Sequence, residues 1–221
     1  MKIINYVSLF KFVFVLFYNM VSIKSDPDPL HDYCVADTKN RQNLFSNGVS
    51  CISPDQTLAS HFATSTLSKP GDMNQFGFNI TLTNTNNLPG LNSFGLVMAR
   101  IDIASNGLVP LHSHPRASEV TILLEGSLLV GFVDTTNHLY TQQLRPGDCF
   151  VFPRGLIHFL YNLDFVNPAL AVSGLSSQNP GAQISSIATF TSKPLVPDEV
   201  LKKGFKINGQ DVTRIRRNLG G

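Results

Sequence analysis

Between residues 94 and 190 the sequence consists of short runs rich in β-branched and aromatic residues, each bounded by Gly, Pro, Asn or Asp. Runs of this kind are typical of β-strands separated by turns. The expected strands cover residues 76–82, 94–103, 120–124, 127–133, 139–144, 149–152, 158–162, 170–173 and 184–190. Regular short strands without intervening helices predict an all-β fold, either an antiparallel sandwich or a barrel.

The connection between two of these runs has Pro146 and Gly147 at its centre, which is the chemistry of a type II turn. After the strands, residues 198–219 carry apolar side chains among lysines and arginines. This segment predicts one or two short helices, broken at Gly204 and Gly209, that lie outside the β core. A chain of 221 residues suits one domain.

The first 25 residues differ from the rest of the chain. A basic start precedes a mostly apolar run at residues 7–23. This pattern predicts a secretory signal peptide at residues 1–25, with an uncleaved anchor as the alternative, and no other segment is expected to cross a membrane. Its removal takes three lysines, so that 17 basic residues fall to 14 against 15 acidic ones. Nothing in this charge balance suggests a nucleic-acid partner, which usually requires a concentrated basic face.

The three cysteines divide into a pair and a single residue. Cys34 and Cys51 flank a polar loop near the expected mature N-terminus, and we expect them to form a disulfide in an oxidising compartment. Cys149 stands in an apolar run and is expected to be a buried free thiol. Asn79 and Thr81 belong to an N-glycosylation sequon, which has meaning only in a secreted chain. The signal peptide, the cysteine pair and the sequon agree with one another.

Three histidines and one glutamate stand at positions that strand geometry can bring together. His112 and His114 are two residues apart, so both side chains point to the same face of an extended strand. Pro115 then lets the chain bend, so that Glu119 can turn back toward them, and His158 begins a later strand. Three neutral imidazoles and a carboxylate suit a divalent ion such as Mn, Fe, Zn, Ni or Cu. Four protein ligands on an octahedral ion leave two positions open, as catalysis requires.

Each of these residues also has an ordinary interpretation. A His-x-His pair by itself is commonly a pair of solvated loop residues, Glu119 alone would be a surface carboxylate, and His158 beside Phe159 fits a core histidine. Spacing alone therefore leaves the metal site and these alternatives open. The remaining histidines, His31, His61 and His138, have no partner at ligand spacing and are expected at the surface.

At these residues the chain resembles the germins and germin-like proteins of plants, a branch of the cupin superfamily. The first cupin motif is matched by His112, His114, Glu119 and Gly126, but its opening glycine falls on Asn106. The second motif is matched in full by Gly147, Pro153, Gly155, His158 and Asn162. Residues 26–37 and 176–181 also look like the family, so the resemblance covers the whole chain.

The resemblance implies a single cupin domain at residues 26–221, folded as a jelly-roll β-barrel with a short C-terminal α-helical extension. It implies a secreted glycoprotein of the apoplast or cell wall, assembled as a hexamer from a trimer of dimers. It carries over His112, His114, Glu119 and His158 as ligands of manganese, as Mn(II)/Mn(III). The implied activity is that of a superoxide dismutase, whose product is hydrogen peroxide.

Two other functions are weighed beside the dismutase. Oxalate oxidase activity is not expected, because the true germins bear asparagines near the metal where this chain aligns Ala99 and Val109. Neither side chain can donate a hydrogen bond to a dicarboxylate, whose oxygens would lose water without gaining a partner. The third hypothesis is a wall-associated receptor or binding protein, with a cell-wall component as partner and a structural metal.

Overall fold

The computed structural model describes residues 31–39, 44–45 and 48–220. The predicted signal peptide at residues 1–25 lies outside these described residues. The architecture reported below belongs to the unit Cys34–Gly221. Within the part of the chain that the structure describes, no helix combines the length and apolar character needed to cross a membrane.

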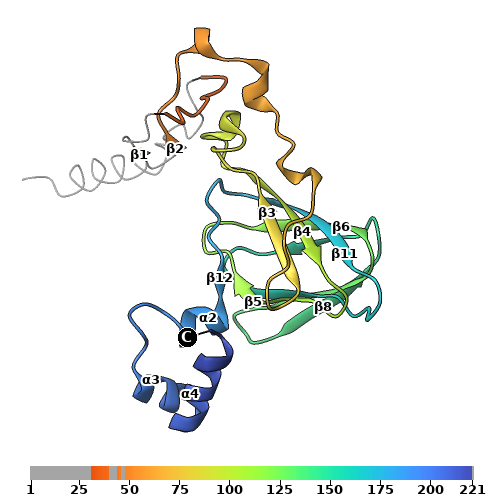
Figure 1. The fold of residues 1–221 in the computed structure, drawn as a ribbon, viewed down its shortest axis with the longest axis vertical. Coiled ribbons are helices and arrows are strands. Elements are labelled where there is room, and N and C mark those ends of the chain that lie inside the picture. The colour runs from red at the N-terminus through yellow and green to blue at the C-terminus, as the bar shows by residue number, and fades with distance from the viewer. Residues whose placement is uncertain (1–30, 40–43, 46–47, 221) are drawn as a thin grey trace, which may run out of the picture. The chain divides into compact units, whose positions relative to one another are not determined.

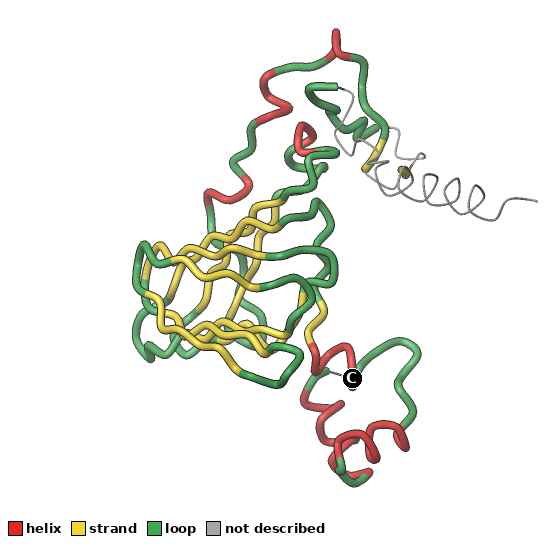
Figure 2. Tube along the Cα trace, turned by 180° about the vertical axis from the view of Figure 1, so that it is seen from behind, coloured by secondary structure: helices red, strands yellow, loops and turns green. Residues whose placement is uncertain are grey.

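Two five-stranded antiparallel sheets make up the fold (Figures 1 and 2). One has the order β12-β5-β10-β7-β8 and the other the order β3-β4-β11-β6-β9. The strands are β3 (Phe78–Leu82), β4 (Val97–Ile103), β5 (Leu108–Ser113), β6 (Glu119–Glu125), β7 (Leu128–Val133), β8 (Leu139–Leu144), β9 (Cys149–Phe152), β10 (Ile157–Tyr161), β11 (Ala169–Leu175) and β12 (Gln183–Ile184). The predicted all-β jelly roll with short C-terminal helices is confirmed.

The core lies between the two sheets because alternate residues of each strand point inward. On β4, Val97, Ala99 and Ile101 are buried, whereas Met98 between them is 50% exposed. The same alternation on the other strands assembles one apolar cluster: Phe78, Val97, Ala99, Ile101, Ile103, Val109, Ala117, Leu123, Leu128, Val130, Leu144, Phe152, Leu160, Ala169, Ala171 and Leu175.

The predicted turn between β8 and β9 is confirmed. The backbone N–H of Asp148 donates to the carbonyl of Arg145 at 2.9 Å. Gly147 at the third position has φ +94°, the left-handed conformation that a type II turn requires there and that glycine adopts without steric cost. This turn delivers β9 to the edge of its sheet.

The prediction for Cys149 was wrong, because this free thiol is exposed. On β9 the buried position is Phe152, and residues one and three before it face outward by the two-residue period of a strand. Val151, which shares the outer face with Cys149, is 54% exposed. An apolar run does not by itself show which of its residues face the core, and Cys149 is on the outer face.

The prediction of a strand at residues 184–190 was also wrong. Only Gln183 and Ile184 pair with β5, and the chain then forms the helix α2 (Ser185–Phe190). Ile184, Ile187 and Phe190 are spaced by three, which suits a helix as well as a strand. Packing decides between them, since Phe190 enters a second apolar cluster away from the barrel.

The C-terminal segment forms the two predicted helices, α3 (Asp198–Phe205) and α4 (Gly209–Asn218). The break falls at Lys206 to Asn208, so Gly204 lies inside α3 and Gly209 begins α4. Asn208 caps α4, because its side chain accepts from the N–H of Asp211 while the Asp211 carboxylate accepts from the N–H of Asn208. Leu201 and Val212 pack with Phe190 in the second cluster, outside the β core.

The segment before the barrel contains short pieces of structure. A disulfide joins Cys34 to Cys51, and Ile52 N–H donates to the carbonyl of Val35 at 2.9 Å beside it. The remaining elements of this segment are the two-residue strands β1 (Leu44–Phe45) and β2 (Gly48–Val49) and the 3₁₀ helices η1 (Pro54–Gln56), η2 (Ala59–Phe62) and η3 (Thr66–Ser68). A fourth 3₁₀ helix, η4 (Pro89–Leu91), lies between β3 and β4.

Candidate metal centre

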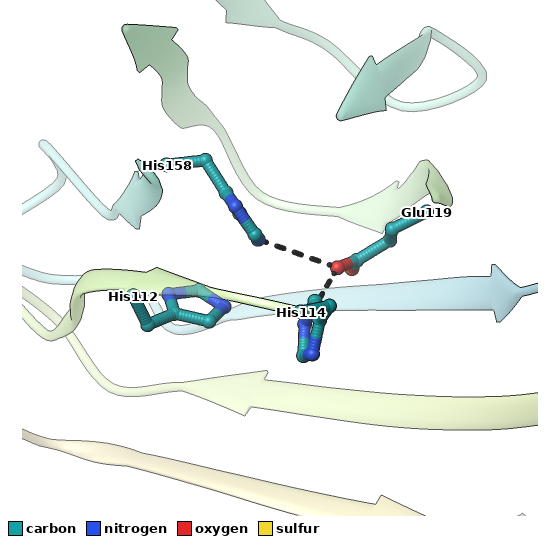
Figure 3. A group of neighbouring side chains, drawn as sticks. All are labelled: His112, His114, Glu119 and His158. Atoms are coloured by element: carbon teal, nitrogen blue, oxygen red, sulfur yellow. Dashed lines mark ion pairs between the residues drawn. The ribbon is translucent and has the colours of Figure 1, made fainter. Parts of the chain in front are cut away.

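The structure brings His112, His114, Glu119 and His158 together inside the barrel (Figure 3). One potential ligand atom from each residue lies within 4.8 Å of the others. The four residues are 3%, 9%, 3% and 1% exposed, respectively. Buried titratable groups at this density require a partner that offsets their loss of hydration.

Strand pairing positions two of the histidines. His112 on β5 is directly opposite His158 on β10 in the antiparallel register, and their ring centroids are 4.0 Å apart. The register shifts immediately beyond this pair, between His158 and Leu160. Both rings therefore point to the same side of one sheet, into the barrel.

A bend after β5 brings the other two ligands in. The carbonyl of His114 accepts from the backbone N–H groups of Gly155, at 3.1 Å, and Ala117, at 3.4 Å. The chain then crosses to the second sheet, where Glu119 is the first residue of β6. The crossing explains how Glu119, an odd number of residues from His114, faces the same cluster.

Each imidazole uses Nδ1 to contact a backbone carbonyl. A carbonyl accepts hydrogen bonds, so this contact places the ring proton on Nδ1 and directs the lone pair of Nε2 into the cluster. The sequence did not reveal these acceptors. The pairs are His112 with Pro110 at 2.8 Å, His158 with Leu156 at 2.9 Å, and His114 with Gly181.

Glu119 meets these nitrogens with one carboxylate oxygen. Its Oε2 lies 3.0 Å from Nε2 of His114 and 3.5 Å from Nε2 of His158 (dashed in Figure 3). Among the described residues, neither Oε2 of Glu119 nor Nε2 of His158 has a hydrogen-bond partner. Lone pairs that converge without a proton between them repel one another unless a cation lies among them. The donor set therefore fits a divalent metal ion.

The protonation states agree with metal binding. Burial, together with the neighbouring His158, lowers the pKa of His112 from 6.5 to about 4, so its imidazole is neutral. Burial raises the pKa of Glu119, but interactions with His114, His158 and Ser173 outweigh burial, and the net pKa is lowered. For His114 burial lowers the pKa. The Glu119 carboxylate and the Gly181 carbonyl raise it by more, so the net pKa is raised.

The second carboxylate oxygen of Glu119, Oε1, accepts a hydrogen bond from a buried hydroxyl group. The Thr121 hydroxyl donates to Oε1 of Glu119 at 3.0 Å, and the hydroxyls of Thr121 and Ser173 are 2.6 Å apart. Both hydroxyl-bearing residues are fully buried. Thr121 could have been found from the sequence, because it stands two residues after Glu119 on one strand. Ser173, from the neighbouring strand β11, gave no sequence signal.

A cavity of about 380 Å³ opens beside the ligands His112, His114 and Glu119. Ala99 and Val109, the residues aligned with the asparagines of true germins, both line it. Neither side chain carries a hydrogen-bond donor. The wall of the cavity is thus apolar at these two positions.

Two motif residues have structural rather than ligand roles. Asn162 is fully buried, but its side-chain amide donates to the carbonyls of Ala104 at 3.0 Å and Asn167 at 2.8 Å, away from the cluster. Asn106 has φ +55°, a left-handed conformation that asparagine tolerates better than most residues. This conformation explains why asparagine can stand where the first cupin motif has glycine.

The other candidate residues lie outside the cluster. His31 and His138 are exposed, and His61 is partly exposed, with its Nδ1 accepting from the N–H of Leu58 at 3.1 Å. Asn79 of the sequon is partly exposed on β3. Its side-chain amide donates to the Asp72 carbonyl at 3.0 Å.

Comparisons with known proteins agree with the fold. A family model described as Cupin matches residues 65–213. The chain is 58% identical over 205 residues to germin-like protein subfamily 1 member 1 of Arabidopsis thaliana, covering 91% of this chain and 94% of that protein. It is 55% identical over 207 residues to germin-like protein 3-1 of Oryza sativa subsp. japonica, covering 91% and 92%.

Solved structures are similar as well. An oxalate oxidase structure superposes with a TM-score of 0.82 at 36% identity, covering 88% of this chain and 98% of that one. A structure of Peruvianin-I, a cysteine peptidase from Thevetia peruviana latex, gives a TM-score of 0.67 at 38% identity, covering 72% and 98%. Proteins at this level of similarity carry different activities, so the reaction has to be argued from the site.

Proposed function

Because the chain belongs to the germin-like proteins of the cupin family, we propose that it is a secreted manganese superoxide dismutase of the apoplast. The observation that carries the proposal is the convergence of three imidazole Nε2 atoms and one carboxylate oxygen in a buried site. Two of these atoms, Glu119 Oε2 and His158 Nε2, have no hydrogen-bond partner among the described residues.

The residues of the chain give the site its shape and charge. His112, His114 and His158 would hold the metal through Nε2, and Glu119 through Oε2. The chemistry that bound manganese supplies is one-electron exchange between Mn(II) and Mn(III), by which two superoxide ions and two protons become oxygen and hydrogen peroxide. Backbone carbonyls fix the imidazole tautomers before metal binding, which limits the cost of reorganisation.

Superoxide makes few demands on the cavity wall. A diatomic anion needs an open coordination position and a source of protons, so the apolar side chains of Ala99 and Val109 do not oppose it. Oxalate differs, because its second carboxylate would be desolvated against the same two side chains. Oxalate oxidation is therefore the less favoured enzyme activity.

A second candidate function is a wall-associated binding protein with a structural metal. The observation that favours it is the size of the apolar cavity, about 380 Å³, which exceeds what a diatomic substrate requires. Ligand turnover separates the two candidates, since a binding protein would retain its ligand unchanged.

Secretion and glycosylation are part of the proposal. They are supported by the signal-peptide pattern at residues 1–25, by the Cys34–Cys51 disulfide, and by the partly exposed sequon residue Asn79. A disulfide of this kind persists in oxidising compartments, which suits the cell wall.

Assembly into a hexamer is proposed on the exposed apolar surface of the barrel. Met98, Val120 and Val151 lie in one row across the sheet, because Met98 and Val120 both pair with Gly174 and Val120 also pairs with Val151. Each of the three side chains is about half exposed. An apolar row on a sheet face is typical of a subunit interface.

The test uses the full-length protein purified from a secreting host. Metal analysis should find manganese, and the same sample should dismute superoxide and release no hydrogen peroxide from oxalate. His112→Ala and His158→Ala should abolish both metal and activity, while His138→Ala, at an exposed position, should alter neither. Fully manganese-loaded protein without dismutase activity would reject the proposal.

A further inference from the structure

The cavity beside the metal ligands is lined mainly by hydrocarbon. Its aliphatic side chains come from five strands of the two sheets, β3, β4, β5, β10 and β11. They are Ile80, Leu82, Val97, Ala99, Ile101, Val109, Leu160 and Leu175. A wall of this composition favours an apolar occupant over water, because the occupant and the wall both lose apolar hydration.

The polar side chains that line the cavity, apart from the ligands, already hold the fold together. Thr83 Oγ1 accepts from Met98 N–H at 2.8 Å, which fixes the loop that follows β3. The oxygen atoms of the three amides also accept hydrogen bonds from neighbouring residues. These bonds are Asn86 N to Asn84 Oδ1 at 2.8 Å, Ser93 N to Gln178 Oε1 at 2.8 Å, and Arg116 Nη2 to Asn179 Oδ1 at 2.9 Å.

Charge limits the occupant to a monoanion. Three neutral imidazoles and one carboxylate carry a charge of −1, so a divalent metal leaves the centre at +1. No lysine or arginine is among the described residues that line the cavity. A monoanion would neutralise the centre, whereas a dianion would leave an uncompensated charge against hydrocarbon, which is costly.

The volume of the cavity indicates an occupant that is larger than its anionic group alone. At roughly 30 Å³ for each water, a cavity of about 380 Å³ has room for roughly a dozen waters. A carboxylate on the metal would fill a small part of this space. An apolar substituent of several carbons would fill more of it and contact the aliphatic wall.

We propose that the cavity binds an organic monocarboxylate, with its carboxylate at an open position of the metal and its apolar body against the aliphatic wall. The inference rests on the metal centre of the proposed function, but not on dismutase turnover. The proposed ligand carries one negative charge, whereas a dicarboxylate carries two. Its apolar body contacts the aliphatic wall, whereas a dicarboxylate would place its second charge there.

The test measures binding to the manganese-loaded protein by calorimetry, with the Mn(II) paramagnetic resonance spectrum as a second readout. Acetate, butyrate and hexanoate form the series, and affinity should rise by roughly fourfold for each methylene that enters the cavity. Adipate has the length of hexanoate and a second carboxylate, and should bind at least tenfold more weakly than hexanoate. Equal affinity for acetate and hexanoate, or for hexanoate and adipate, would overturn the inference.

Two variants test the location. Val109→Thr keeps the shape of the side chain and adds a hydroxyl to the wall, so it should weaken hexanoate binding several-fold while the manganese content stays the same. The matched control is Val166→Thr, at a position 81% exposed, which should bind hexanoate as the unaltered chain does. Unchanged hexanoate affinity in Val109→Thr would contradict the proposed location.

Metal content and dismutase activity are measured on the same samples, so that two failures can be told apart. Loaded, active protein that binds no hexanoate overturns the ligand inference and leaves the dismutase. Protein that takes up no metal overturns both. Hexanoate binding that persists in the metal-free His158→Ala variant contradicts the proposed contact with the metal.

Discussion

The hydroxyl oxygens of Thr121 on β6 and Ser173 on β11 are 2.6 Å apart in the fully buried interior. The Thr121 hydroxyl donates to Oε1 of Glu119, and the Ser173 hydroxyl beside it also helps to lower the pKa of Glu119. The two residues are paired across neighbouring strands, and the backbone register therefore sets their contact. Glu119 is oriented by these two hydroxyls, which leaves its other oxygen facing the histidines.

Replacing Thr121 by valine should weaken manganese binding. The substitution keeps the shape of the side chain and removes the donor to Glu119 Oε1, and the loss of such a supporting contact typically reduces metal affinity by about 10- to 100-fold. Competition with a chelator of known affinity measures the effect. Thr141→Val, at an exposed position on β8, is the matched control. Equal affinities in the two variants would show that Thr121 does not orient the ligand.

The loop that holds His114 depends on Arg116. The Arg116 side chain donates from Nε to the Asn179 carbonyl at 2.6 Å and from Nη2 to Asn179 Oδ1, two residues before Gly181. Gly181 has φ +66°, and a Cβ there would lie 2.8 Å from the Arg116 guanidinium. Arg116→Gln should therefore loosen the Gly181 carbonyl from His114 and lower manganese affinity several-fold. Arg145→Gln, at an exposed turn position, should not, and the same chelator competition compares them.

Removal of the metal should lower the stability of the chain. A ligand that binds only the folded state stabilises it by about 4 kcal/mol at a free concentration of 1,000 times Kd. The thermal midpoint should thus rise with manganese concentration and fall on addition of a chelator. His158→Ala, which lacks one ligand, should show a midpoint that responds much less to either addition. A chelator shift of equal size in this variant would place the metal elsewhere.

Acid should destabilise the metal-free protein through His112. Its folded pKa of about 4 lies below the ordinary 6.5, so the unfolded chain binds more protons between these values and stability falls as the pH falls from 6.5 to 4. The loss over this window is on the order of 3 kcal/mol. His114 has a raised pKa, and its contribution is instead lost as the pH rises above 6.5.

Denaturant unfolding of the metal-free chain at pH 6.5 and pH 4.5 checks the prediction. His112→Gln should flatten the change between the two pH values, whereas His138→Gln, at an exposed position, should retain it. If the free energy of unfolding falls equally in both variants between the two pH values, groups other than His112 cause the acid sensitivity.

Much of the fold could be predicted from the sequence, because short β-branched runs and turn residues mark strands locally. Leu139–Leu144 and Cys149–Phe152 have the predicted bounds. The error at Ser185–Phe190 arose because apolar residues spaced by three suit two structures, and only the partners in the second cluster select the helix. Cys149 was misplaced because burial depends on which face of β9 meets the other sheet.

The cluster of potential metal ligands was predictable as a set, since His112, His114, Glu119 and His158 stand at motif spacing and converge in the fold. Their supporting partners were not. The Gly181 carbonyl and the Ser173 hydroxyl reach the cluster through strand register and loop path, which no local pattern encodes. The apolar cavity likewise emerges only when side chains from separate strands are brought face to face.

The three imidazoles are held by main-chain carbonyls rather than by neighbouring side chains. An amino-acid substitution leaves the main-chain carbonyl in place, whereas it replaces a side chain of the cavity wall directly. The coordination geometry and the wall are therefore separable under mutation. Residues of the cavity wall, such as Ala99 and Val109, can therefore change without disturbing the carbonyls that orient the imidazoles.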